Sequence, residues 1–356
     1  MMQISPETQL FIREHSSDDV RVLALQAKKY PDIDMPTAIT QIAGRKVAAE
    51  KIPSWWEIEK IWYPKHLSLE QCSSEITARY KARLLQGDSL TDLTGGFGID
   101  CSFLATGFKS TTYVERQEEL CEIAAHNFPV LNLNHINIKN EDGVTYLQAM
   151  SPVDCLFLDP ARRNEHGGKT VAISDCEPNV AELEELLLQK ANRVMIKLSP
   201  MLDLSLALKE LKQTQEVHIL SVNNECKELL ILLGQTSPTE ISSHCVNLST
   251  KGTQEEQHFV FTREQEQCSE CTYTDSLETY LYEPNASLLK AGAFRSIAAA
   301  YPVRKLHPNS HLYTSDTFIE NFPGRIFRIV NQCSFNKKEV KENLADLKKA
   351  NVTVRN

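Results

Sequence analysis

Hydrophobic positions divide the chain into two regions with different periods. Up to about residue 75 the apolar residues recur at helical spacing, as in SSDDVRVLALQAKKY and MPTAITQIAGRKVAAEKI. Ser and Asp at the start of the first stretch and Pro36 near the start of the second are typical of helix N-termini. From about residue 88, short β-type runs alternate with helical segments. The seven runs are SLTDL, STTYVE, HINIKN, VDCLFLD, RVMIKLS, EVHILSV and ELLILLG.

This alternation predicts βαβ units, and therefore an α/β fold with a parallel, doubly wound sheet. Between the runs, QEELCEIAAHNF places Leu120, Ile123, Ala124 and Phe128 on one helical face. Only NNECK separates the last two runs, which is too short for a crossover helix. We therefore expect a hairpin there that adds an antiparallel strand at one end of the sheet.

After Gly234 the alternation stops. SSHCVNLST and QHFVFTREQ predict another hairpin, within a small α+β module that ends near residue 280. The remaining residues predict a terminal module of helices and short strands.

All three tryptophans lie within SWWEIEKIWYP, at Trp55, Trp56 and Trp62. We expect them to anchor the helical region on its neighbour. The alternative is an aromatic platform on which a nucleic-acid base stacks.

The chain has 356 residues, enough for two or three domains. No apolar run approaches the roughly 20 residues that span a bilayer, and the N-terminus does not resemble a signal peptide. We therefore predict a cytoplasmic protein without a membrane partner. The oligomeric state stays open.

Ten cysteines occur without regular spacing, and in a reducing compartment they are expected to be free. Cys268 and Cys271 form a CxxC pair, which is half of a zinc site that His244 and either Cys245 or His258 would complete. Because no second CxxC supports this interpretation, we predict no metal.

Charge is distributed unevenly along the chain. The net charge is −9. From Asn285 onward, however, the sequence contains 12 Lys and Arg but only 5 Asp and Glu, so the C-terminal end is basic. The overall charge argues against a protein that coats nucleic acid, whereas the basic end is compatible with local contact to phosphates.

A glycine-rich loop, TDLTGGFGID, follows the first predicted strand, with glycines at positions 95, 96 and 98. Glycines between a strand and a helix allow a tight turn and close approach of a ligand. The strict dinucleotide pattern GxGxxG is not met, and neither is the phosphate-binding GxxxxGK[ST] pattern. A merely structural turn is the remaining alternative.

Acidic residues follow four consecutive predicted strands, at Asp92, Glu115, Asp142 and Asp159. Open α/β sheets bind ligands at the carboxyl ends of their strands. S-adenosylmethionine suits such a set, because its ammonium, ribose diol and adenine amine are all hydrogen-bond donors.

These segments resemble the class I S-adenosylmethionine-dependent methyltransferases across about residues 71–235. DLTGGFG resembles their first motif, YVE their ribose-binding acid, NED their adenine-contacting acid and DPAR their fourth motif. The resemblance implies a seven-stranded Rossmann-like sheet and S-adenosylmethionine as cofactor. The implied cofactor-binding residues are Asp92, Thr94, Gly95, Gly96, Gly98, Glu115, Asp142 and Asp159.

The flanking segments LSLEQCSSEITARYKARLL, YEPNASLLKAGAF and FPGRIFRI resemble bacterial methyltransferases with a ferredoxin-like insert and a C-terminal THUMP-like domain. This implies an N-terminal helical region (1–75), a methyltransferase domain (76–235), a ferredoxin-like module (236–280) and a THUMP-like domain (281–356). It also implies an RNA substrate, either tRNA or rRNA. The basic end then supplies Arg304, Lys305 and Arg325 as candidate RNA contacts.

DPARR is expected to face the methyl acceptor. Asp159 and the Pro160 carbonyl are the candidate catalytic groups toward a base nitrogen, and Arg162 and Arg163 are candidates to stack on a base or hold a phosphate. The motif departs from Asp/Asn-Pro-Pro-Tyr of base-amine methyltransferases, since Ala161 and Arg162 replace the second proline and the aromatic.

Methylation at carbon 5 of uracil is disfavoured, because KLSPMLD after the next strand offers no cysteine nucleophile. Three alternatives stay open. They are transfer of the aminocarboxypropyl group, a small-molecule or protein acceptor, and a catalytically silent RNA-binding scaffold.

Overall fold

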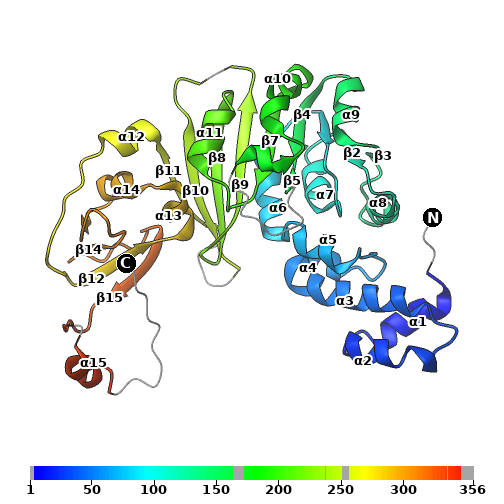
Figure 1. The fold of residues 1–356 in the computed structure, drawn as a ribbon, viewed down its shortest axis with the longest axis horizontal. Helices are drawn as coiled ribbons and strands as arrows, with labels where there is room; N and C mark the ends of the chain where they lie inside the picture. The colour runs from blue at the N-terminus through cyan, green and yellow to red at the C-terminus, as the bar shows by residue number, and fades with distance from the viewer. Residues whose placement is uncertain (1–3, 163–171, 237, 251–255, 335, 346–356) are drawn as a thin grey trace. The chain divides into compact units, whose positions relative to one another are not determined.

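A computed structural model of the protein describes residues 4–162, 172–236, 238–250, 256–334 and 336–345 (Figure 1). The chain forms two compact units. The first comprises Met1–Gln215 with Leu229–Pro238, and the second comprises Glu216–Glu228 with Thr239–Asn356.

The N-terminal region is helical, as predicted, and Figure 1 shows α3, α4 and α5 side by side. Three of its helices begin at polar side-chain caps. Ser5 Oγ accepts from Thr8 N (3.2 Å) and Asp34 Oδ1 accepts from Thr37 N (3.3 Å). The helices of this region are α1 (Pro6–Glu14), α2 (Val20–Leu25), η1 (Ala27–Lys29), α3 (Met35–Lys51), α4 (Pro53–Trp56), α5 (His66–Gln71) and α6 (Glu75–Ala82).

Two of the three tryptophans anchor this region, which confirms that prediction for them. Trp55 is buried and meets the ring of Phe97 edge-on, with ring centroids 5.2 Å apart. Trp62 stacks on His126 at 3.7 Å. Trp56 is 42% exposed, so it does not share this role.

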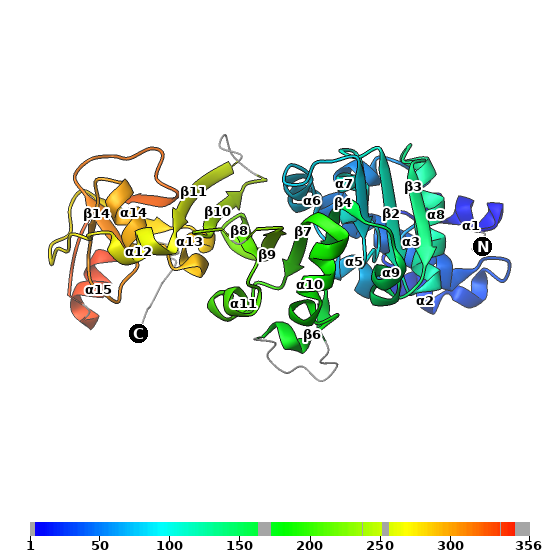
Figure 2. The same cartoon turned by 90° about the horizontal axis from the view of Figure 1, so that it is seen from above.

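Each of the seven β-type runs forms a strand, and the predicted α/β fold is confirmed. The strands run in the order β3-β2-β1-β4-β7-β9-β8, and all pairings among β1, β2, β3, β4 and β7 are parallel. Figure 2 shows β2 and β3 next to each other with α8 beside them. The strands are β1 (Ser89–Asp92), β2 (Ser110–Glu115), β3 (Ile136–Asn140), β4 (Val153–Leu158), β7 (Ala191–Leu198), β8 (Thr214–Val222) and β9 (Glu225–Gly234).

The predicted hairpin exists, but its place in the sheet was predicted wrongly. β9 lies between β7 and β8, antiparallel to β7, instead of at one end. The turn at Asn223 and Asn224 has positive φ at both residues (50° and 66°), a conformation that asparagine tolerates and that two-residue hairpins favour. Because β9 returns beside β7, the far edge of β8 is left for another strand.

That edge is occupied by the strand after residue 240. β10 (Ser242–Leu248) pairs in parallel with β8, and β11 (Glu256–Thr262) pairs antiparallel with β10. Within the described ranges the sheet therefore has nine strands in place of the expected seven, and the hairpin assigned to a separate module continues it. Pairing of an exposed edge explains this, since unpaired strand edges invite unwanted association.

The connections between the parallel strands are helical, as expected. All four predicted core-facing residues of α8 are buried. The helices are α7 (Ile99–Ala105), α8 (Glu118–Val130), α9 (Gly143–Ala149), α10 (Val180–Lys190) and α11 (Leu204–Glu210), with the short elements β5 (Ala161–Arg162), η2 (Ile173–Asp175) and β6 (Cys176–Glu177).

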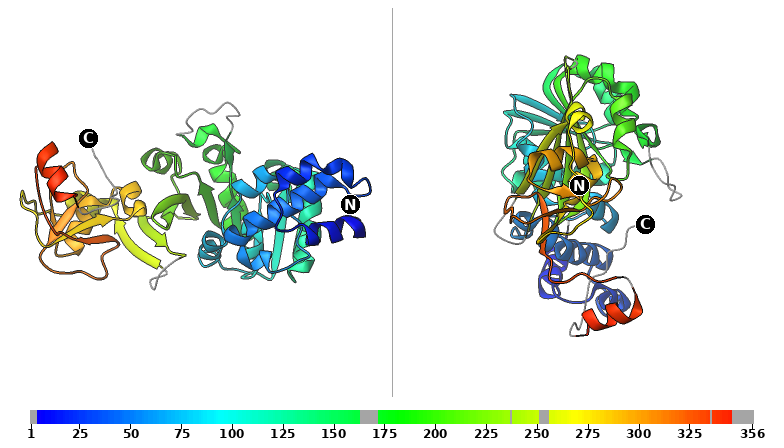
Figure 3. Two further views of the ribbon diagram at one scale, coloured as in Figure 1. Left: turned by 90° about the horizontal axis from the view of Figure 1, so that it is seen from below. Right: turned by 90° about the vertical axis from the view of Figure 1, so that its left-hand side faces the viewer.

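The second unit also contains a four-stranded antiparallel sheet in the order β13-β14-β12-β15. Tyr282, Tyr313 and Phe322 are buried there. Figure 3 shows the orange helices of this unit close to its strands. The elements are α12 (Arg263–Cys268), β12 (Tyr280–Pro284), α13 (Ala286–Ala291), α14 (Phe294–Ala300), β13 (Arg304–Lys305), β14 (Tyr313–Ser315), β15 (Gly324–Arg328) and α15 (Lys337–Asn343).

The ten cysteines are free thiols, as expected, and Cys155 is buried in β4. Across the described ranges, the helices are all too short or too polar to cross a membrane.

Close packing at Gly44 on α3 gives a stability prediction. A Cβ at Gly44 would lie 2.3 Å from the Cβ of Tyr63, whose backbone is held by Gln41 through hydrogen bonds of 2.8 and 2.9 Å. Gly44→Ala should therefore destabilise the protein by about 1–3 kcal/mol in denaturant unfolding. The helix propensity of alanine alone would give the opposite sign, about 1 kcal/mol of stabilisation.

Gly107→Ala is the control, because the nearest atoms to a Cβ there are Leu104 O at 3.6 Å and Leu85 O at 4.0 Å, both ordinary contact distances. It should change the free energy of unfolding little. A Gly44→Ala protein as stable as wild type would refute close packing of α3 on the segment around Tyr63.

Candidate functional site

The glycine loop between β1 and α7 needs its glycines for two reasons, close packing at one position and positive φ at the other two. A Cβ at Gly95 would lie 2.2 Å from the Tyr113 ring. Gly96 and Gly98 have φ of +54° and +86°, which strains residues with a side chain. At Gly96 the nearest atom to an added Cβ is Thr94 O at 3.8 Å, so the backbone there borders open space.

Hydrogen bonds fix the loop on the neighbouring strand. Gly95 N donates to Val114 O (2.8 Å), and the Tyr113 hydroxyl donates to Gly96 O (2.5 Å). The loop is therefore held in one conformation, with Gly96 presented outward.

The four predicted acids lie at one edge of the sheet. Asp92 ends β1 and Glu115 ends β2, while Asp159 directly follows β4. Asp142 follows β3 by two residues and is the N-cap of α9. Parallel pairing brings the carboxyl ends of these strands together, which is where open α/β sheets bind ligands.

Two of these acids are oriented by backbone groups. Glu115 accepts from Gly96 N and Gln117 N, one at each oxygen and both at 2.8 Å. Asp142 accepts from Val144 N, Thr145 N and the Thr145 hydroxyl, all at Oδ1. The carboxylates are thus fixed while lone pairs stay available to a ligand that donates hydrogen bonds.

Asp92 is the most deeply buried of the four acids, at 1% exposure. Its Oδ1 accepts from Thr94 N (3.0 Å), and Thr94 in turn accepts from Asp159 N (2.6 Å) through its hydroxyl. Burial raises the pKa of Asp92 well above its ordinary value, and the nearby carboxyl groups of Asp100, Asp159 and Glu115 add to the rise.

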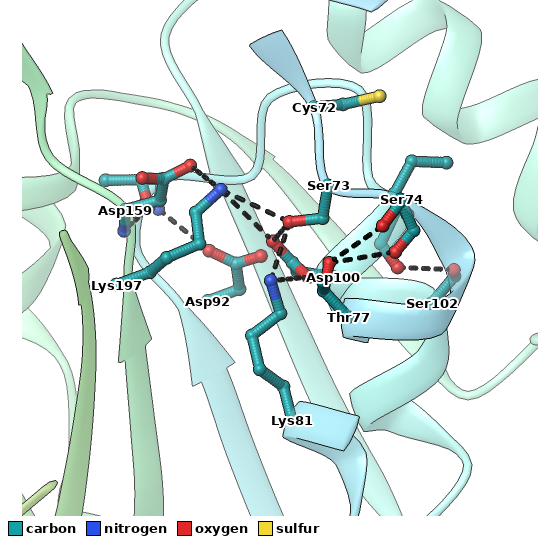
Figure 4. A network of polar contacts seen from close by, with 12 residues as sticks. Cys72, Ser73, Ser74, Thr77, Lys81, Asp92, Asp100, Ser102, Asp159 and Lys197 are labelled. Carbon is teal, nitrogen blue, oxygen red and sulfur yellow. Dashed lines mark hydrogen bonds and ion pairs between the residues drawn. The ribbon is translucent and has the colours of Figure 1, made fainter. Parts of the chain in front are cut away.

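A buried polar network that the sequence reasoning missed adjoins these acids (Figure 4). Lys81 Nζ contacts Asp100 Oδ1 (2.8 Å), and Lys197 Nζ contacts Asp159 Oδ2 (2.5 Å). Ser73 Oγ lies between the two lysines. It accepts from both Nζ atoms (2.6 and 3.2 Å) and donates to Asp100 (2.7 Å). The network joins α6, α7, β7 and the end of β4.

Both lysines are shielded from water, with side chains 0% and 9% exposed. Burial alone would raise the pKa of Asp100, but Lys81 and Lys197 lower it below its ordinary value. One signal of this network was visible in the sequence, since Lys197 interrupts the apolar run RVMIKL. Buried lysines are rare unless they are paired.

The described structure places the predicted DPARR residues only in part. Pro160 is buried beside Asp159, and the backbone of Arg162 lies in β5 opposite Cys176. The side chain of Arg162 and the whole of Arg163 lie outside the described residues.

The three basic residues predicted to contact RNA lie in the small sheet of the second unit, but in different environments. Arg304 pairs with Glu278, and Arg325 pairs with Glu283 at 2.5 Å. Lys305 is buried, and its Nζ donates to Pro308 O (2.8 Å). Its ammonium is therefore directed into the protein, and we withdraw Lys305 as an RNA contact.

The comparison that identifies the chain is with a crystal structure from Porphyromonas gingivalis W83, described as a putative methyltransferase. It is 33% identical to this chain, with a TM-score of 0.84, across 97% of this chain and 87% of that one. This chain belongs to that methyltransferase family. The class I methyltransferase fold expected from the sequence is thereby confirmed.

A family model for a ferredoxin-like domain matches residues 280–323 of this family member. The match lies C-terminal to residues 236–280, where we expected such a module, so the domain boundaries and the THUMP-like assignment stay predictions. None of the curated proteins matches the chain.

Two other solved structures each cover less than half of this methyltransferase family member. An rRNA methylase from Streptococcus thermophilus is 14% identical over 44% of this chain and 94% of its own, with a TM-score of 0.34. SMU.1697c from Streptococcus mutans, solved in complex with SAH, is 13% identical over 45% of this chain and 96% of its own, with a TM-score of 0.33.

The raised pKa of Asp92 predicts that its buried carboxyl group destabilises the folded state of this methyltransferase family member as the pH rises. A carboxyl group with a raised folded-state pKa contributes stability below its unfolded pKa, and that contribution is lost as the pH rises through the folded value. Asp92→Asn keeps an acceptor for Thr94 N and cannot ionise. It should therefore raise the melting temperature at pH 8 by a few degrees, or about 0.5–2 kcal/mol.

The gain should shrink at pH 4, where wild-type Asp92 is protonated. Asp88→Asn serves as control because Asp88 is exposed and its carboxylate pairs with exposed Lys109. A destabilised Asp92→Asn protein at pH 8 would show that Asp92 is ionised and held by its neighbours.

Proposed function

We propose that this chain is an S-adenosylmethionine-dependent methyltransferase that acts on tRNA or rRNA at a base nitrogen. The observation that carries the cofactor assignment is the set of acids at four successive strand ends around a glycine loop that is open at Gly96. A structural turn alone would not require these fixed carboxylates.

The donor groups of S-adenosylmethionine match the acceptors of the site. Glu115 offers one oxygen to each hydroxyl of the ribose, and Asp142 offers Oδ2 to the adenine amine. The backbone at Gly96 leaves room for the amino acid end. When bound, the cofactor supplies a methyl group on a sulfonium, and positive charge leaves sulfur on transfer.

Asp159 is proposed to face the methyl acceptor together with the Pro160 carbonyl. The ion pair with Lys197 holds the Asp159 carboxylate in one orientation and opposes the burial that raises the pKa of Asp159 above its ordinary value. An ionised carboxylate accepts a hydrogen bond from a base nitrogen and aligns its lone pair. Lys197 acts in this proposal as a positioning residue.

RNA contact is proposed for the exposed face of the small sheet. The register β13-β14-β12-β15 puts Arg304, Arg325 and Phe327 on one face. Phe327 is 43% exposed, and the Arg325 guanidinium lies 5.7 Å from its ring centroid. An arginine beside an exposed aromatic ring, with a second arginine on the same face of the sheet, suits phosphate contact and base stacking in single-stranded RNA.

The separate roles of Glu115 in cofactor binding and Asp159 in methyl transfer are tested by measuring transfer of label from S-adenosylmethionine to RNA. The RNA is taken from a strain that lacks the protein. Glu115→Gln should weaken cofactor binding by about 10–100-fold, the value of charged hydrogen bonds. Asp159→Asn should lower kcat by about 10²–10⁴-fold while changing the cofactor Kd little.

Glu118→Gln, at an exposed residue three positions along, should behave as wild type. Binding of cofactor without methyl incorporation into any RNA would favour another acceptor or a silent scaffold. Labelling from the aminocarboxypropyl group alone would show the alternative transfer reaction.

The RNA surface is tested by double charge reversal. Arg304→Glu with Arg325→Glu should weaken RNA binding and lower the slope of log K against log salt by about 1.4, or 0.7 for each lost phosphate contact. Lys28→Glu with Lys29→Glu changes the charge equally at exposed residues of the first unit and should have a smaller effect. Equal effects of the two pairs would remove the small sheet from the RNA interface.

A further inference from the structure

Three histidines and a glutamate gather on one face of β8, β10 and β11, within the second unit and apart from the acids described above. His244 of β10 is the register partner of His218 on β8, and Glu216 is the partner of Ser242 two residues before it. His258 of β11 is the partner of Val246, two residues after His244. Because residues two apart on a strand share a face, all four side chains emerge on the same side.

The side chains make close mutual contacts. His218 Nε2 lies 3.3 Å from Glu216 Oε2, and His244 Nδ1 lies 3.2 Å from His258 Nε2. The rings of His218 and His244 stack with centroids 4.3 Å apart. Ligand atoms of Glu216, His218 and His244 all lie within 4.8 Å of one another.

We propose that Glu216, His218, His244 and His258 bind a zinc ion. Two ligand atoms of a tetrahedral zinc site with bond lengths of 2.0–2.1 Å are separated by about 3.3 Å. The His218–Glu216 and His244–His258 separations already have this value. Small rotations of the side chains then bring the two pairs around one ion.

The donor set also fits zinc chemically. Three imidazole nitrogens and one carboxylate oxygen are ligands that zinc accepts, and calcium and magnesium prefer oxygen ligands alone.

Cys268 and Cys271 do not belong to this site. Among the described residues, the groups that gather closely enough to hold a metal ion are Glu216, His218 and His244, without either cysteine. An ion here would connect three adjacent strands, β8, β10 and β11, and so stabilise the second unit. This role is independent of the proposed methyl transfer.

The test uses the full chain, freed of metal with a chelator and dialysed. Titration with Zn²⁺ followed by elemental analysis should show one tightly bound ion per chain, and Co²⁺ should give the visible absorption of tetrahedral coordination. Glu216→Gln and His258→Ala should each weaken Zn²⁺ binding by about tenfold or more. His258 is exposed, so its replacement should leave the fold intact.

His66→Ala removes an exposed histidine of the first unit and should bind Zn²⁺ as wild type does. Bound Zn²⁺ should also raise the melting temperature of the wild type and have a smaller effect on the His258→Ala protein. The proposal would be overturned if the wild type bound no stoichiometric ion. It would also be overturned if the Glu216→Gln and His258→Ala proteins bound Zn²⁺ as tightly as the wild type does.

Discussion

Parallel pairing of β1 with both β2 and β4 is the constraint on which the candidate site depends. It sets Asp92 opposite Tyr113 on one side and Phe157 on the other. Glu115 and Asp159 follow those partners by two residues, so the three acids reach the same edge of the sheet. The hydrogen bond from Asp159 N to Thr94 then connects the loop after β1 to the end of β4.

Burying carboxylates at this edge of the sheet costs folding free energy. Neighbouring lysines offset that cost for some of the carboxylates and not for others. Asp100 and Asp159 are paired with Lys81 and Lys197, and Ser73 connects the two lysines. Asp92 has no such cation among its described partners, and burial raises its pKa well above the ordinary value. Burial also raises the pKa of Asp159, although Lys197 opposes this rise, whereas the two lysines lower the pKa of Asp100. Active sites commonly retain such destabilising groups, because the same group that costs stability serves a ligand.

The sequence predicted the strands, the glycine loop and the acids well, because each depends on local pattern. Alternating periods identify strands and helices, and each acid directly follows its own strand. The contacts of Lys81 and Lys197 were not predictable in this way. These residues are 116 positions apart, and only the packing of α6 against the sheet brings them to Ser73 and Asp100.

The histidine cluster was predicted only in part, for a related reason. His244 and His258 were named as possible partners of Cys268 and Cys271, but His218 and Glu216 were not. β8 and β10 were assigned to separate modules, and their parallel pairing sets His218 beside His244. The sequence alone offered Cys268 and Cys271 as the more conspicuous pattern, although neither joins the cluster. Lys305 illustrates the opposite error, because a basic residue in a basic segment proved to be buried.

The most direct test of the central claim is a crystal structure of the protein with S-adenosylhomocysteine. The ribose hydroxyls should lie within hydrogen-bond distance of Glu115, and the adenine amine should lie near Asp142. A ligand bound elsewhere, or no ligand at saturating concentration, would contradict the assignment of these strand ends as the cofactor site.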